Sequence, residues 1–285
     1  MAADYLTMEL SVVLNTVVEL PPAPQILPKL QKLLRDMNSG LTDIVSLLKL
    51  DAGLTAQIVR MSNSAFYGGV PVQGLDEAVN RLGFREVFRI VGLAATKQAL
   101  GGALETYKMP KGELLEQSVA VAVAMTTIRT SRVKAEDDSR YTIGLLHALG
   151  KVVINQFFVK KGMEIYDLDA DEDIDVKTER SILGFDHAEA GAAIMEKWKF
   201  SSEIHVTVAC QYEPDKAGEH KETACLLALS RWCVKPIREK TNVMRLSFDE
   251  PSGYIETLGL TEDSMREFIQ TAQEDYEKIR EMFSN

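Results

Sequence analysis

Cysteine is scarce in this chain of 285 residues, and its three cysteines follow no metal-binding spacing. Cys210, Cys225 and Cys233 form no Cys-x-x-Cys pair, and an odd number cannot all be joined in internal disulfides. Unpaired cysteines of this kind are typical of a reducing compartment, so we expect a cytoplasmic protein. The N-terminus has no basic segment followed by an apolar block, and no secretory signal is predicted.

Long apolar runs and positive charge are lacking as well. No uninterrupted apolar segment approaches the ~18 residues of a membrane-spanning helix, so no membrane association is expected. Acidic residues outnumber basic residues by 42 to 32, which gives a formal net charge of −10. Because affinity for nucleic acids comes mainly from lysine and arginine, this balance disfavours nucleic acid as a partner.

The alternating pattern of β-strands is also rare, and the spacing of apolar residues is helical almost throughout. We therefore predict an all-α fold with an N-terminal helical subdomain over residues 1–108 and a helical bundle over 109–285. The boundary follows from the flexible segments 101–102 and 107–112. The predicted helices cover 4–19, 24–37, a short segment from Thr42, 51–63, 75–82, 84–100, 113–132, 137–158, 176–183, 186–198, 201–212, 223–234 and 261–283.

Isolated polar residues fall on the apolar faces of several helices in the second block. Helical steps of three and four place Gln117 with Val121, and His147 with Ile143. Each could be an ordinary buried polar side chain, but an unpaired one costs ~1–3 kcal/mol, so several should meet one another, water or a ligand. The predicted polar pocket contains Gln117, His147, His187, Gln211, Tyr212 and Ser230.

This inward set does not predict a metal site. Zinc and the first-row divalent ions need about three histidine, carboxylate or thiolate ligands, and the set offers only His147 and His187. Glu179 and Glu189 are the nearest acidic residues, and we expect both in a first helical turn or at the surface. Without a metal to lower the pKa of water, metal-assisted hydrolysis is lost. We therefore predict no catalytic residue, metal or cofactor.

Several motifs together resemble the HDOD (HD-related output domain) family. The resemblance covers roughly residues 20–235, and its most specific element is the run Asn63-Ser-Ala-Phe-Tyr-Gly68. It implies an all-α protein in which an N-terminal helical subdomain packs on an HD-like bundle. The other matching segments are 20–24, 51–62, 78–83, 144–151 and 179–191.

The resemblance also shows where this chain departs from metal-binding HD proteins. Such relatives place His-Asp at the position of His147-Ala148, and a histidine at His187. They also place histidines at Gln117 and around Gln211-Tyr212, and an aspartate near Ser230. This chain keeps two of these residues, and the resemblance therefore implies a degenerate metal site.

The run Asn63-Ser-Ala-Phe-Tyr-Gly68 allows two interpretations. Asn63 and Ser64 can end a helix, while Phe66 and Tyr67 can anchor the turn against the second block. The run is then either a structural corner or a surface that couples the two blocks.

We expect a regulatory module of bacterial-type signal transduction that is not an enzyme and acts through signalling protein partners. A nucleotide or another small ligand is the candidate occupant of the polar pocket. The alternative is a metal-dependent phosphohydrolase of the HD type, with an atypical ligand set built on His147 and His187.

Overall fold

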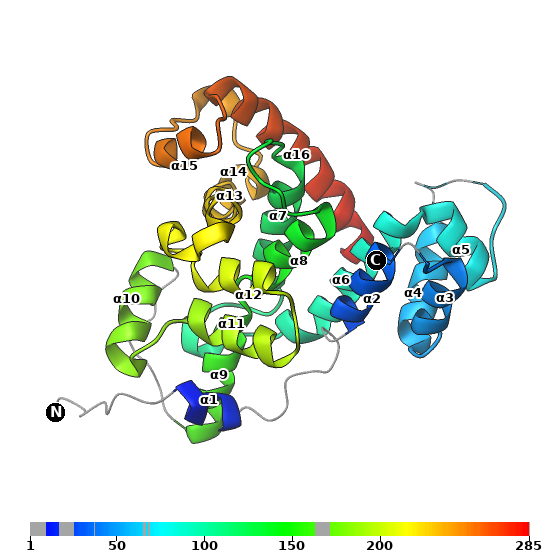
Figure 1. Cartoon of the computed structure of the whole chain (residues 1–285), viewed down its shortest axis with the longest axis horizontal. Helices are drawn as coiled ribbons and strands as arrows, with labels where there is room; N and C mark the ends of the chain where they lie inside the picture. The colour runs from blue at the N-terminus through cyan, green and yellow to red at the C-terminus, as the bar shows by residue number, and fades with distance from the viewer. Residues whose placement is uncertain are drawn as a thin grey trace.

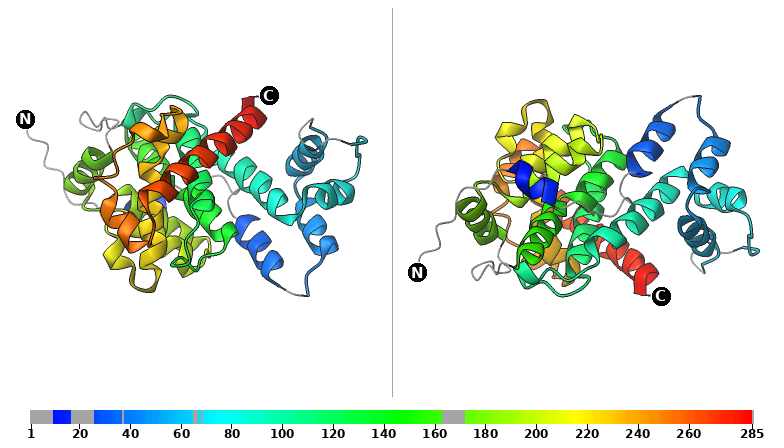
Figure 2. Two further views of the ribbon diagram at one scale, coloured as in Figure 1. Left: turned by 90° about the horizontal axis from the view of Figure 1, so that it is seen from above. Right: turned by 90° about the horizontal axis from the view of Figure 1, so that it is seen from below.

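The computed structural model describes residues 10–16, 26–36, 38–64, 67, 69–162 and 172–284. Within these ranges every regular element is a helix, apart from one isolated antiparallel bridge between Leu104 and Met109. The predicted all-α fold is therefore confirmed. Figure 1 and Figure 2 show a small group of helices at one end of a larger helical bundle.

In the small group, which we call the first lobe, one helix begins at the polar cap Asp51, and the helices after Gly40, Gly74 and Gly83 begin without a side-chain cap. The Asp51 carboxylate accepts a hydrogen bond from the Leu54 amide at 3.0 Å, which satisfies one of the free donors of a helix start. Gly83 adopts a positive φ of 77° between two helices, a conformation that favours glycine. The helices of the first lobe are α2 (Ile26–Arg35), α3 (Leu41–Leu48), α4 (Ala52–Ser62), α5 (Leu75–Leu82) and α6 (Phe84–Leu100).

The bundle contains the remaining helices. Its start is marked by Gly112, which has a φ of 87° directly before α7. The long helices are α7 (Glu113–Thr127), α8 (Asp137–Leu146), α9 (Leu149–Lys161), α10 (Glu172–Leu183), α11 (His187–Lys197), α12 (Ser202–Ala209), α13 (Lys221–Trp232) and α16 (Glu262–Ser284). The short ones are η2 (Glu105–Tyr107), η3 (Pro214–His220), α14 (Val234–Arg238), η4 (Val243–Arg245) and α15 (Ser252–Thr257).

The first described helix, α1 (Leu10–Thr16), packs against α9 and α11 of the bundle rather than against the first lobe. Figure 1 shows it beside α9. Its side chain Val13 is fully buried. The division at residue 108 stays a prediction. Helix α1 precedes this residue in the sequence but packs on the bundle.

One predicted helix, 137–158, is two helices in the structure. The chain turns at His147 and Ala148 between α8 and α9. By length and composition the stretch Asp137–Lys161 could cross a membrane, but 89% of its apolar window is buried inside the fold. Such burial is typical of a central core helix, and the turn places His147 at the junction.

Glycine allows two pairs of bundle helices to approach with their backbones in contact. A Cβ atom on Gly144 of α8 would lie 2.4 Å from the Cα of Ala122 on α7. A Cβ atom on Gly150 of α9 would lie 1.8 Å from the carbonyl oxygen of His187 at the start of α11. These contacts leave no room for a side chain, and the second one fixes α9 against the helix that carries His187.

The first lobe meets the bundle through α6 and α2, which pack on α8. Arg35 donates a hydrogen bond to the hydroxyl of Ser139 at 2.7 Å, and the Arg89 guanidinium lies 5.9 Å from the ring centre of Tyr141. A cavity of about 620 Å³ lies at this junction, where three arginines face three acidic residues: Arg35, Arg85, Arg89, Glu136, Asp137 and Asp138.

Candidate functional site

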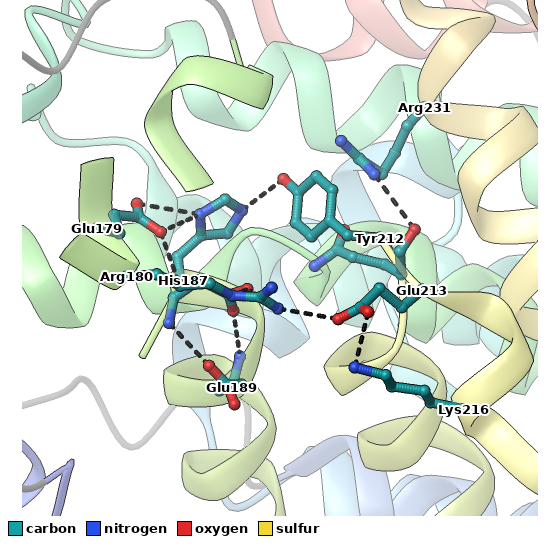
Figure 3. A network of polar contacts seen from close by, with 10 residues as sticks. Glu179, Arg180, His187, Glu189, Tyr212, Glu213, Lys216 and Arg231 are labelled. Carbon is teal, nitrogen blue, oxygen red and sulfur yellow. Dashed lines mark hydrogen bonds and ion pairs between the residues drawn. The ribbon is translucent and has the colours of Figure 1, made fainter. Parts of the chain in front are cut away.

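His187 is held between a carboxylate and a phenol inside the bundle. Its Nδ1 lies 2.8 Å from Oε2 of Glu179, and its Nε2 lies 2.8 Å from the hydroxyl of Tyr212. The backbone amide of His187 also donates to Glu179, at 2.7 Å. Figure 3 shows these three side chains in a row. Both ring nitrogens are therefore engaged with protein groups.

Local structure explains why Glu179 of α10 reaches His187. Asp186 begins α11 with a reciprocal capping box: its carboxylate accepts from the Glu189 amide, and its own amide donates to Glu189, each at 2.9 Å. Arg180 of α10 in turn binds Asp186 at 2.8 Å. This ion pair holds the end of α10 against the start of α11, so that the neighbouring Glu179 faces the first residue of α11 (Figure 3).

Glu179 is fully buried, in contrast to its predicted place in a first turn or at the surface. That expectation was wrong, because α10 begins earlier than predicted and turns this face toward the bundle. Burial raises the pKa of Glu179, but attraction to the His187 ring and hydrogen bonds from His187 and Tyr107 outweigh it. The net pKa lies below its ordinary value of 4.5, so Glu179 is a carboxylate at neutral pH. Glu189, by contrast, is exposed in the first turn of α11.

Two tyrosines complete the surroundings of the Glu179–His187 pair. The Tyr107 hydroxyl donates to Oε1 of Glu179 at 2.5 Å. The Tyr212 ring meets the His187 ring edge-on, with centroids 5.4 Å apart. Its hydroxyl can donate to a neutral imidazole or accept from an imidazolium. Both carboxylate oxygens of Glu179 and both ring nitrogens of His187 therefore have hydrogen-bond partners among the described residues.

His147 occupies a different position, at the junction of α8 and α9. Its Nδ1 lies 2.8 Å from the carbonyl oxygen of Gly144 in its own helix. Its backbone carbonyl accepts a hydrogen bond from the side-chain amide of Gln211, at 3.0 Å. Gln211 thus connects the end of α12 to the turn that carries His147.

A pocket of about 470 Å³ opens beside His147. Gln117 of α7 also lines it, and its side-chain amide donates to Glu113 at 2.9 Å. The remaining lining residues come from the loop after η2, from α7 and α9, and from the region of α13 and α14: Tyr107, Lys108, Met109, Pro110, Glu113, Val121, Lys151, Arg231, Trp232, Val234 and Lys235.

The structure does not bring the six predicted pocket residues together in one cavity. Gln117 and His147 line one cavity. His187 and Tyr212 form a hydrogen-bonded pair, and Gln211 binds the backbone of His147. Ser230 is fully buried and lies outside the lining of the cavity. Its hydroxyl has no hydrogen-bond partner among the described residues.

Four further residues of this region were missed by the sequence analysis: Tyr107, Lys151, Glu179 and Arg231. Lys151 is 3% exposed, and its Nζ lies 5.1 Å from the ring centre of Tyr107. The Arg231 guanidinium lies 4.0 Å from the ring centre of Tyr212. The position of Lys151, four residues after His147 on a predicted helix, was the one available signal, since that spacing shares a helix face.

The residues at the end of α4 form hydrogen bonds mainly with the loop that follows and with α5. The Asn63 side chain donates to the Val72 carbonyl at 2.7 Å and accepts from the Val72 amide at 2.8 Å. Arg81 donates to the carbonyl of Ser62 at 3.0 Å. Burial and the neighbouring Glu86 of α6 both raise the pKa of Tyr67. These contacts all lie within the first lobe.

The other residues of this motif add little. The buried hydroxyl of Ser64 has no hydrogen-bond partner among the described residues. Phe66 lies outside the described residues. The coupling of the two blocks by this motif therefore stays a prediction.

The residues present do not fit the metal that HD relatives hold. Within the described ranges, no three histidine, cysteine, aspartate or glutamate side chains come together as ligands. A metal on Nε2 of His187 would have to displace the hydroxyl of Tyr212. His147 is followed by Ala148, whose methyl group donates no electron pair.

A model of the HDOD domain matches residues 20–214, which is more than half of the chain. The chain belongs to the HDOD domain family. The resemblance carried by the Asn63–Gly68 run and the region around His187 is thereby confirmed.

Solved structures of other HDOD-like proteins share the fold. An HDOD domain protein of unknown function from Geobacter sulfurreducens superposes with a TM-score of 0.66 at 20% identity, covering 96% of this chain and 98% of its own. A protein from Marinobacter aquaeolei VT8, provisionally named as a signal transduction protein, superposes with a TM-score of 0.68 at 23% identity. That match covers 95% of this HDOD chain and 61% of the Marinobacter chain.

A sequence relative occurs in Treponema pallidum (strain Nichols), where it is an uncharacterized protein. It is 22% identical over 264 residues, which is 91% of this HDOD chain and 50% of the relative. The chain thus spans about half the length of the curated relative it matches.

Proposed function

We propose that this HDOD protein is a regulatory module of signal transduction that acts through contacts with signalling proteins and is not an enzyme. The provisional name of the Marinobacter protein supports the first part. The state of His187 supports the second, and it is the observation on which the proposal depends.

An HD-type hydrolase needs histidine lone pairs directed at a metal, which then lowers the pKa of a bound water. In this chain Nδ1 of His187 faces Glu179, and Nε2 faces the Tyr212 hydroxyl. The carboxylate of Glu179 itself accepts hydrogen bonds from Tyr107 and His187. The pair is therefore satisfied internally, as expected for a structural network at a former metal site.

The pocket beside His147 gives the module a place for a small ligand. Its volume of about 470 Å³ is within the range of small-molecule pockets. A nucleotide or another small molecule bound there could bias the protein between two partner-binding states, because any ligand that prefers one state shifts the population toward it. The cytoplasmic location expected from the free cysteines stays a prediction.

The test is to load the purified protein with Mn²⁺ or Zn²⁺, remove excess ion by dialysis, and measure bound metal by elemental analysis. Phosphate release from a generic phosphomonoester is measured in parallel with each ion. We expect far less than one metal per chain, and no metal-dependent release of phosphate.

Two variants make this result decisive. His147→Ala and His187→Ala should leave the background metal content unchanged. A stoichiometric metal that is lost in either variant, together with phosphate release, would contradict the proposal and favour a phosphohydrolase with an atypical ligand set.

A further inference from the structure

The C-terminal helix α16 carries an apolar stripe that is buried along most of its length. The stripe consists of Met265, Ile269, Ala272, Tyr276 and Ile279. Their steps of four, three, four and three residues place them on one face of the helix. The first four side chains are at most 2% exposed, whereas Ile279 is half-buried. Burial of the stripe therefore decreases toward the end of the helix.

Most of α16 is fixed to the bundle. The helix packs on α7 and α14. The side-chain amide of Gln273 donates to the carbonyl oxygens of Pro236 and Thr241, at 2.9 and 3.0 Å. From there α16 continues to the junction with the first lobe (Figure 1), where Ile279 lies. The helix thus has a part anchored on the bundle and an end that reaches the other lobe.

Ile279 closes a small groove to which both lobes contribute. Met61 of α4, with Ile90 and Leu93 of α6, comes from the first lobe, and Tyr141 of α8 comes from the bundle. These four side chains are at most 9% exposed and form an apolar floor. Only about 20 Å³ of open space remains beside Ile279, which is room for about one water molecule. The isoleucine therefore fills most of the groove.

The rim of this groove adjoins the family motif at Asn63–Gly68. Polar side chains form the rim, namely Gln57, Glu86 and Arg89. Arg89 lies 3.7 Å from Glu86. Burial raises the pKa of Tyr67, and the charge of Glu86 together with a hydrogen bond to it raises that pKa further. Glu86 thus connects Tyr67 of the motif to the groove that Ile279 occupies.

The contact at Ile279 is small compared with the packing inside each lobe. The helices α3, α4 and α5 pack mainly on one another and on α2 and α6, and α2 and α6 in turn pack on α8. Ile279 adds a contact through which α16 reaches α4 directly. One half-buried side chain near a helix end can open while the rest of the fold stays closed, because local stability is lowest at such places.

We propose that the end of α16 is a releasable clamp between the lobes. With Ile279 in the groove, α4 of the first lobe is held against the bundle. When Ile279 withdraws, the groove is exposed beside the family motif and the first lobe is loosened. A signalling protein that binds only the open form would shift the population toward it. The clamp goes beyond the proposed function, because it concerns the coupling of the lobes and holds whether or not the protein binds a metal.

Hydrogen exchange followed by mass spectrometry on the full chain tests the clamp. An aspartate at position 279 cannot enter the apolar groove without a large desolvation cost. In Ile279→Asp we therefore expect the amides of α4 and of the first half of α6 to exchange about tenfold faster than in the parent. Those of α7 and α13 should exchange at the parental rate. The matched control is Thr271→Asp, at an exposed position of the same helix, which should exchange as the parent does throughout.

A second variant separates the clamp from fraying of α16. Ile279→Ala removes the side chain from the groove but keeps a residue that favours helix. It should give the same pattern with a smaller increase, about threefold. Unchanged exchange in α4 and α6 in both variants would overturn the proposal. An increase confined to α16, or one spread equally over the bundle, would overturn it as well, since the first indicates fraying and the second a general loss of stability.

Discussion

The hydroxyl of Tyr212 lies 2.8 Å from Nε2 of His187, on the side of the ring opposite Glu179. A neutral histidine whose Nδ1–H donates to a carboxylate has its one free lone pair on Nε2. Tyr212 therefore takes the position from which a metal would bind this ring. Both histidines kept from the HD pattern are buried, yet in the part of the chain that the structure describes neither belongs to a group of three metal-ligating side chains.

Removal of the Tyr212 hydroxyl should destabilise the protein modestly. Tyr212→Phe keeps the ring against His187 but deletes one buried hydrogen bond, so we expect a loss of about 1 kcal/mol in the free energy of unfolding. Urea denaturation measures it. In a His187→Gln background the same substitution should cost clearly less, and an equal cost in both backgrounds would show that the hydroxyl acts elsewhere.

Glu179 should make stability sensitive to acid. Its pKa in the folded protein lies below the ordinary value of 4.5, so its contribution is complete above about pH 5 and is lost as the pH falls through the folded pKa. Glu179→Gln should cost roughly 2 kcal/mol at pH 7, and its unfolding free energy should fall less steeply between pH 5 and 3.

The control for this profile is Glu196→Gln, on the exposed side of α11. It should follow the parent at every pH. Some acid sensitivity should remain in Glu179→Gln, because arginine partners also hold the pKa values of Glu113 and Asp137 below their ordinary range. Parallel profiles for the parent and Glu179→Gln would contradict a buried carboxylate at Glu179 with a lowered pKa.

A methyl group at Gly150 should be costly. Its Cβ would lie 1.8 Å from the His187 carbonyl oxygen, so α9 and α11 would have to separate. We expect Gly150→Ala to lower the free energy of unfolding by about 3 kcal/mol. Gly253→Ala on α15, where no atom lies within 4 Å of the added Cβ, should be neutral or stabilising by up to about 1 kcal/mol. Thermal unfolding of both variants distinguishes close packing from a general effect of glycine replacement.

Asn63 should stabilise the first lobe through its two hydrogen bonds to Val72. Asn63→Ala is expected to cost roughly 1–2 kcal/mol, since the buried backbone groups lose their partner. The exposed Asn80 on α5 provides the control, and Asn80→Ala should change stability by less than about 0.5 kcal/mol. A cost in Asn63→Ala no larger than in the control would argue against a structural corner.

The sequence was sufficient to predict the bounds of helices that have clear end signals. The bounds predicted for α5 and α6 agree with the structure, because Gly74, Gly83 and Gly101 interrupt the apolar pattern there. The start predicted at Asp186 for the helix 186–198 also agrees, since Asp186 is the N-cap of α11. The turn at His147 was missed, since the apolar spacing continues through it from α8 into α9.

The contacts within the site could not be predicted from helical periodicity, because they join side chains of different helices. Glu179 is a charged residue on the highly charged helix α10, and its approach to His187 accompanies an ion pair between the neighbouring Arg180 and Asp186. Lys151 and Arg231 lie against tyrosines from distant parts of the chain. Helical spacing identifies which residues face inward, but it does not identify their partners.

The backbone contact between Gly150 and His187 also has a mechanical consequence. No side chain separates α9 from the first turn of α11 at this point, so there is nothing compressible to absorb a displacement. Lys151 follows Gly150 directly and lines the pocket. A displacement of α9 by a molecule in the pocket would therefore move the first turn of α11 with it.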